Sequence, residues 1–98
     1  MQTLTKNYRV DDEDDYTIEY REQPDGSFKI FSPKCPSDPH GNGPTVHHRY
    51  STGEICITAG REPQTLDRAV GIASVWMKRY SQYIRTGTFS NAKGRVEV

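Results

Sequence analysis

The sequence lacks several features that would place it in a familiar class of proteins. Its 98 residues contain only two cysteines, Cys35 and Cys56, whereas small secreted domains are usually held by several disulfides. No apolar run approaches the roughly 20 residues that a membrane helix requires. The amino terminus also lacks the apolar segment of a signal peptide. We therefore expect a cytoplasmic protein with reduced thiols and no membrane partner.

Net charge is absent as well, because 13 basic residues balance 13 acidic ones. The isoelectric point of about 6.8 lies below the range typical of nucleic-acid-binding domains, so nucleic acid is not an expected partner. The charges are unevenly distributed. Residues 1–26 hold eight acids and three bases (−5), and residues 27–98 hold five acids and ten bases (+5). This separation favours a protein partner of complementary charge.

The length suits one domain with a single modest core. Residues 1–15 are polar and end in five consecutive acids, which predicts a flexible arm or, alternatively, a docking surface for a basic partner. From Tyr16 to Phe31, apolar and polar residues alternate in two runs that flank Pro24-Asp25-Gly26. This pattern predicts an antiparallel hairpin over residues 16–31.

The second half of the chain predicts a loop, short strands and a long helix. Residues 32–45 contain four prolines and two glycines, which exclude a helix or a central strand. Short strands are expected near residues 45–58. Apolar residues then recur at three- and four-residue spacing over 65–86, which predicts an amphipathic helix with Thr65 as its N-cap and Gly87 at its C-terminal end. Residues 91–98 form a polar tail. The fold class is therefore α+β.

The run from His47 to Cys56 is the strongest chemical feature, because it places two imidazoles close in sequence to a thiol. A cysteine between two isoleucines is typical of core packing. A Cys-His protease dyad is a second interpretation, although protease nucleophiles usually open a helix. A zinc site is a third, although the short paired ligand spacings of structural zinc are missing. Its ligands would come from Cys35, His40, His47 or His48, and Cys56.

The same run resembles the active-site segment of ubiquitin-conjugating enzymes. When the two are aligned on the cysteine, four positions match without a gap, namely Tyr50, Gly53, Ile55 and Cys56. The family's His-Pro-Asn triplet does not match, and its positions hold Val46, His47 and His48. Bacterial relatives often carry a His before the Tyr in place of the Asn, so the departure resembles the bacterial branch.

The later helix resembles the same branch, in which it tends to read Trp, three residues, Tyr, two residues, an aromatic residue and then Thr-Gly. The matching positions here are Trp76, Tyr80, Tyr83, Thr86 and Gly87, followed by Phe89. The resemblance covers residues 16–90 and leaves the family's N-terminal helix and later C-terminal helices without a counterpart. It implies a trimmed bacterial version of the ubiquitin-conjugating (UBC-like) fold, in which a small antiparallel sheet packs against one long helix.

This resemblance implies a transferase. Cys56 would accept a ubiquitin-like modifier as a thioester from an activating enzyme and pass it to an amine of a target. His48 occupies the position of the family's Asn and would donate an N–H to the oxyanion of the transfer step. His47 has at most a supporting role, and neither Glu62 nor Asp67 is assigned to the incoming amine.

By resemblance, the partners are a ubiquitin-like modifier, an activating enzyme and, in some systems, a deconjugating metallopeptidase. Such bacterial pathways are often linked to antiphage defence. No cofactor or metal is implied. The alternative is a non-catalytic interaction module of the same fold, in which Cys56 is a packing residue; the missing triplet and helices favour this alternative, whereas the register of Cys56 with Tyr50 and Gly53 favours the enzyme.

Overall fold

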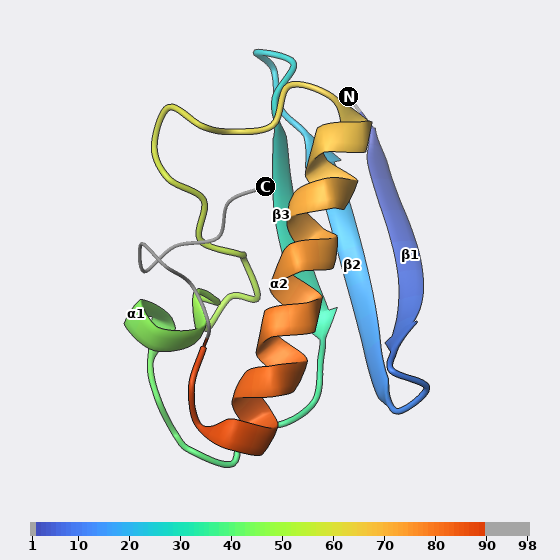
Figure 1. The fold of residues 1–98 in the computed structure, drawn as a ribbon. Coiled ribbons are helices and arrows are strands. Elements are labelled where there is room, and N and C mark those ends of the chain that lie inside the picture. The colour runs from blue at the N-terminus through green and yellow to red at the C-terminus, as the bar shows by residue number, and fades with distance from the viewer. Residues whose placement is uncertain (1, 90–98) are drawn as a thin grey trace.

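The computed structural model describes residues 2–89 as one antiparallel sheet covered by one long helix. Strands β1 (Thr3–Val10), β2 (Asp14–Glu22) and β3 (Phe28–Lys34) are hydrogen-bonded in the order β1-β2-β3. Helix α2 (Leu66–Thr86) runs across one face of this sheet, and the single-turn helix α1 (Pro44–His47) lies beside it (Figure 1). The predicted α+β class is confirmed.

The predicted hairpin is formed by β2 and β3. The chain reverses at Pro24-Asp25-Gly26, where Gly26 adopts a φ of 88° that favours glycine. The Asp25 carboxylate accepts hydrogen bonds from both the backbone N–H and the hydroxyl of Ser27, which closes the turn. Alternation along β2 places Tyr16, Ile18 and Tyr20 toward α2, and all three are buried.

Strand β1 corrects the prediction of a flexible arm over residues 1–15. It pairs with β2 along its whole length, from Thr3 opposite Arg21 to Val10 opposite Asp14. The connection is a tight turn in which Asp11 and Asp12 both have a φ of 55°. Because β1 is an edge strand with only its last residues against the core, its sequence carries no clear apolar alternation. Backbone pairing with β2 holds it instead.

Helix α2 has the predicted bounds and caps. The Thr65 hydroxyl accepts from the backbone N–H of Arg68, and Gly87 ends the helix with a φ of 81°. The apolar stripe of α2 packs on the inner face of the sheet, where Tyr16 meets the Trp76 ring edge-on at a centroid distance of 5.8 Å. The buried apolar residues of this helix are Ala69, Ile72, Ala73, Trp76, Met77, Tyr80 and Tyr83.

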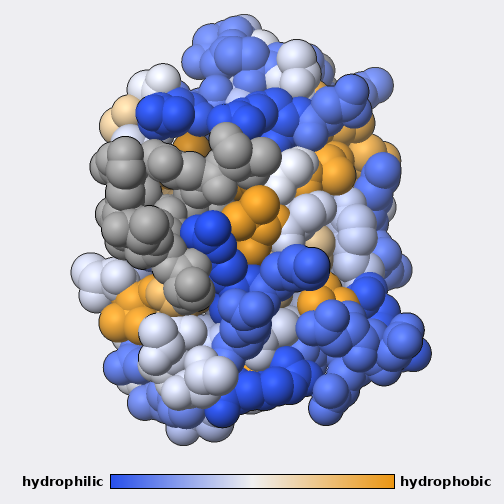
Figure 2. Space-filling model, in the orientation of Figure 1, coloured by the Kyte–Doolittle hydropathy of each residue, from blue (hydrophilic) through white to orange (hydrophobic). Residues whose placement is uncertain are grey.

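Between β3 and α2 the chain is mostly irregular. The short strands expected near residues 45–58 are reduced to two isolated bridges, Phe31 with Glu54 and Arg49 with Ile55. The predicted polar tail, 91–98, lies outside the described residues. On the face that carries α2, hydrophilic side chains cover most of the surface, and apolar side chains form small separate patches (Figure 2).

Candidate functional site

Cys56 lies on a short hairpin of residues 48–56, which we call the Cys56 hairpin. Its two arms are joined by a hydrogen bond from the Cys56 N–H to the His48 carbonyl and another from the Tyr50 N–H to the Glu54 carbonyl, each 2.8 Å long. The chain reverses between Tyr50 and Gly53, whose N–H donates to the Tyr50 carbonyl. The hairpin therefore holds the thiol on a defined backbone, although no regular strand is present there.

The hairpin is attached to the free edge of β3. The Ile55 N–H donates to the Ile30 carbonyl over 2.8 Å, and the Ser32 N–H donates to the Gly53 carbonyl over 2.7 Å. The guanidinium of Arg49 donates twice to the Ser32 carbonyl, at 2.8 and 3.1 Å. Ile55 is fully buried in the core, so its neighbours Glu54 and Cys56 point away from the core.

The structure brings the predicted site residues Cys56 and His48 together. A pocket of about 360 Å³ is lined by Cys56, His48, Tyr50, Pro44 and Thr45. Cys56 is partly exposed, and Tyr50 is 48% exposed. Cys56 therefore lies at the edge of a small pocket and is not one of the buried core residues under α2.

The environment of Cys56 does not favour the thiolate. Burial raises the pKa of the Cys56 thiol above its ordinary value, and the negative charge of Glu54 raises this pKa further, whereas hydrogen bonding with the Tyr50 side chain lowers it. A thiol of this kind is mostly protonated at neutral pH and is nucleophilic only in its small ionised fraction. Chemistry at Cys56 therefore needs an activated electrophile.

His48 lies beside the thiol in a constrained conformation. It ends α1 with a left-handed φ of 60°, and its N–H donates to the Pro44 carbonyl over 2.9 Å. The residue is only 6% exposed, and its ring meets that of Phe89 edge-on at a centroid distance of 5.1 Å. Burial lowers the pKa of the His48 imidazole, so the ring is neutral near pH 7 and keeps one N–H to donate.

His47 points to the other side of the chain, and its hydrogen bonds hold the surrounding segment in place. Its Nε2 donates to the Asn42 carbonyl over 2.8 Å, and its Nδ1 accepts from the Arg49 N–H at 3.3 Å. The indole N–H of Trp76 donates to the His47 carbonyl over 2.9 Å. These bonds tie the segment before the Cys56 hairpin to α2.

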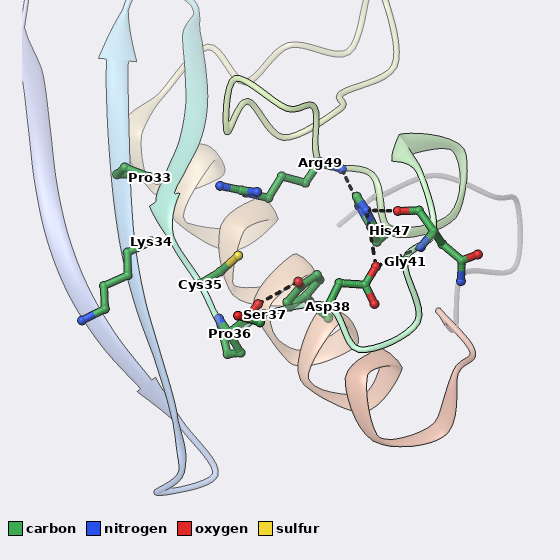
Figure 3. Close-up of a pocket in the computed structure, with 11 residues that line it drawn as sticks. Pro33, Lys34, Cys35, Pro36, Ser37, Asp38, Gly41, His47 and Arg49 are labelled. Carbon is green, nitrogen blue, oxygen red and sulfur yellow. Dashed lines mark hydrogen bonds and ion pairs between the residues drawn. The ribbon is translucent and has the colours of Figure 1, made fainter.

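Cys35 belongs to a second pocket of about 490 Å³, on the His47 side. Figure 3 shows Cys35, Asp38, His47 and Arg49 pointing toward a shared space, with Lys34 directed away from it. The Asp38 carboxylate accepts from the His40 and Asn42 N–H groups and from the Tyr83 hydroxyl. These bonds fix the proline-rich loop, so the role of Asp38 that they account for is structural.

The proposed ligands of a zinc site do not converge, because Cys35 and His47 line one pocket while Cys56 and His48 line another. Among residues 2–89, no group of three or more His, Cys, Asp or Glu side chains is arranged to hold a metal ion.

The acidic residues that are close to Cys56 in sequence lie in different parts of the structure. The Glu62 carboxylate accepts from the Gly60 N–H in the following loop, and Asp67 lies in the first turn of α2. Glu54 lies on the Cys56 hairpin itself, two residues before Cys56.

Over the same described part of the chain, no helix has the length and apolar character needed to cross a bilayer. The chain matches no protein-family model, no curated protein and no solved structure at a significant level.

Proposed function

We propose that this protein is a ubiquitin-conjugating-enzyme-like transferase that carries a ubiquitin-like modifier as a thioester on Cys56. The observation that supports this most is the pocket shared by Cys56, His48 and Tyr50, on a hairpin that follows the sheet and precedes the long helix along the chain. The order of sheet, thiol and covering helix along the chain is the one that the sequence resemblance implies.

The first step is transthiolation. The Cys56 sulfur attacks the thioester carbonyl presented by an activating enzyme, the new S–C bond forms, and the enzyme's thiolate leaves. One thioester replaces another, so the exchange is nearly balanced in free energy. A small thiolate fraction suffices when the partner positions the electrophile, which is compatible with the raised pKa of Cys56.

The second step passes the modifier to an amine and builds an oxyanion on the thioester carbonyl. The neutral His48 ring lies in the same pocket as the sulfur, where its N–H can donate to that oxygen. Removing one such donor costs about 3 kcal/mol in other enzymes, which corresponds to roughly 100-fold in rate. His47 does not take part, because both of its ring nitrogens already have backbone partners.

The partners of this proposal are a ubiquitin-like modifier, an activating enzyme and a deconjugating metallopeptidase. We place the pathway in the bacterial cytoplasm, with antiphage defence as its setting.

The test is a charging assay with activating enzyme, modifier and ATP, followed by a non-reducing gel. We expect a band that dithiothreitol removes, that is lost in Cys56→Ala, and that persists in the matched control Cys35→Ala. His48→Ala should still charge but should transfer to lysine about 100-fold more slowly. Equal loss of charging in both Cys56→Ala and His48→Ala would exclude the oxyanion role.

The other candidate is a non-catalytic interaction module with the same fold. The raised pKa and partial burial of the Cys56 thiol favour it. It predicts that no thioester band forms with any activating enzyme, and that Cys56→Ala binds partners as the unaltered protein does.

A further inference from the structure

Strand β1 forms an open edge of the sheet. In the ladder that joins it to β2, the Glu22 N–H donates to the Gln2 carbonyl over 2.8 Å, and the pairing continues as far as Val10 opposite Asp14. Along an antiparallel strand, successive residues direct their backbone groups alternately toward one neighbour and the other. The groups of β1 that point away from β2 therefore belong to every second residue, namely Thr3, Thr5, Asn7 and Arg9.

These outward groups have no backbone partner among residues 2–89. The opposite edge of the sheet differs, because the Cys56 hairpin binds the outward groups of β3 at Ile30 and Ser32. Edge strands are commonly protected by proline, by a bulge or by a covering element. Strand β1 contains no proline or glycine and pairs with β2 without a register shift. Its regular edge is thus open to a further strand (Figure 1).

The face of β1 that looks toward α2 carries both an exposed apolar side chain and an apolar groove. Tyr8 and Val10 pack against the core, so Leu4 shares their face, and Leu4 is 37% exposed. A groove of about 290 Å³ lies between the other end of β1 and α2, with apolar walls formed by Tyr8, Val10 and Met77. One strand therefore offers both parts of a self-complementary contact.

We propose that a second copy of this chain pairs with β1 through its own β1, antiparallel and about a two-fold axis, so that one sheet continues across both copies. With Asn7 opposite Asn7, each Leu4 lies opposite the Val10 of the other copy. Residues of this parity form pairs without backbone hydrogen bonds, whose side chains approach closely. Leu4 of each copy then fills the groove beside Val10 of the other, as a self-complementary two-fold interface requires.

Charge favours the same arrangement. A register centred on Lys6 would place two ammonium groups directly opposite each other, which destabilises a sheet, and the Asn7 register avoids this. The antiparallel direction also brings the acidic turn 11–13 of each copy to the start of the other β1, where Arg21 and Lys29 follow across the sheet. A parallel pairing would instead bring the two acidic turns together.

The interface is small, and it is separate from the candidate site. A standard stable interface buries about 1,600 Å², and one strand with its flanking side chains buries less. We therefore expect a dimer with a Kd on the order of 10 μM. The two Cys56 hairpins lie at the outer edges of the joined sheet, so the dimer leaves both thiols uncovered, and this inference does not depend on the proposed function.

The first test is sedimentation equilibrium of the full chain between about 1 μM and about 1 mM. We expect a monomer–dimer equilibrium whose Kd rises about tenfold in Leu4→Lys, because an ammonium group then meets the apolar groove. Thr5→Pro should raise it similarly, since proline removes an outward N–H and leaves the bonds to β2 intact. The control Ser51→Lys adds the same charge at an exposed position on the opposite edge and should leave the Kd unchanged.

The second test examines the register. Asn7 lies on the proposed two-fold axis, where the two Cα atoms would be about 5.5 Å apart. In a background with Cys35→Ala and Cys56→Ala, Asn7→Cys should be cross-linked to a covalent dimer by a short bismaleimide. Thr3→Cys is the matched control and should not be cross-linked, because the two Thr3 residues would be roughly 26 Å apart along the paired strands.

Each result decides the proposal. A protein that stays monomeric over the whole concentration range would overturn it. So would a dimer whose Kd is the same in Leu4→Lys, or one that is cross-linked at Thr3→Cys but not at Asn7→Cys. If circular dichroism shows that Thr5→Pro does not fold, Leu4→Lys still decides, because it alters an exposed side chain. Loss of thioester charging would remove the proposed function and leave these outcomes unchanged.

Discussion

Cys56 has a pH dependence that follows from its surroundings. Because burial raises the pKa of its thiol, less thiolate is present at a given pH than in an ordinary cysteine. We predict that the rate of alkylation by iodoacetamide climbs with pH to a midpoint above that of the same cysteine in the urea-unfolded chain. The measurement is a pH–rate profile with the Cys56 peptide quantified by mass spectrometry.

Tyr50 supplies the control for that profile. Its side chain lowers the pKa of the Cys56 thiol, so Tyr50→Phe should move the midpoint to still higher pH. A midpoint in the folded protein at or below the unfolded one would contradict the burial that the structure assigns to the thiol.

The sequence predicted Cys56 and His48 as the pair of residues in the candidate site and assigned no acid to them. Cys56 and His48 were identified from the register with Tyr50 and Gly53, and the structure places them in one pocket. Their roles in chemistry remain predictions. The orientation of Glu54 has no signal in the sequence, because a residue near a turn has no periodic pattern of its own, and its face is decided only when Ile55 docks on Ile30.

At the scale of elements, the Cys56 hairpin depends on the close approach of Gly53 to the backbone of β3. Its φ is 92°, and a Cβ at this position would lie 3.1 Å from the Ser32 carbonyl oxygen. We predict that Gly53→Ala lowers the free energy of unfolding by about 1–3 kcal/mol, because the left-handed backbone and the contact with β3 are both strained. Urea denaturation measures this change.

Gly26 is the matched control for this substitution. Its φ of 88° is similar, but a Cβ there would meet nothing within 4 Å. Gly26→Ala should therefore cost only the backbone strain, about 1 kcal/mol. Equal losses at the two positions would mean that the hairpin does not press on Ser32.

The β1–β2 turn is joined to the end of α2 by Arg85. Its guanidinium binds the buried Asp14 carboxylate at 2.8 and 3.1 Å and the Glu13 carboxylate at 2.9 Å. We predict that Arg85→Gln lowers the urea midpoint more than Arg9→Gln does, because Arg9 pairs with the exposed Asp15 and exposed pairs contribute little.

The pH dependence of this pair has a definite sign. Hydrogen bonding to Arg85 lowers the pKa of the Asp14 carboxyl below its ordinary value of 3.8. The pair therefore stabilises the fold above that value, and its contribution is lost as the pH falls through the lowered pKa. Arg85→Gln should lose less stability than the unaltered protein between pH 5 and acid conditions of about pH 2; an equal loss would contradict the pairing.

At the scale of the whole molecule, one core joins the sheet, α2 and the segment before the site. Trp76 is fully buried, contacts Tyr16 of β2, and donates its indole N–H to the His47 carbonyl. We predict that Trp76 fluorescence and far-UV circular dichroism report the same urea midpoint, as expected for a cooperative single domain. An earlier fluorescence transition would mean that the segment carrying the site opens separately from the sheet.

Local chemistry determined those parts of the fold that the sequence predicted by itself. The hairpin turn at Pro24-Asp25-Gly26 and the helix between Thr65 and Gly87 depend on residues a few positions apart. Their dihedral preferences and spacing can be recognised directly from the sequence. The tertiary structure alone decided the rest. Polar β1 is a strand because β2 offers it a partner, and the Cys56 hairpin takes its orientation from β3. His48 reaches the thiol pocket because a left-handed backbone and contact with Phe89 place it there. These placements depend on contacts between residues distant in sequence, and no local propensity encodes such contacts.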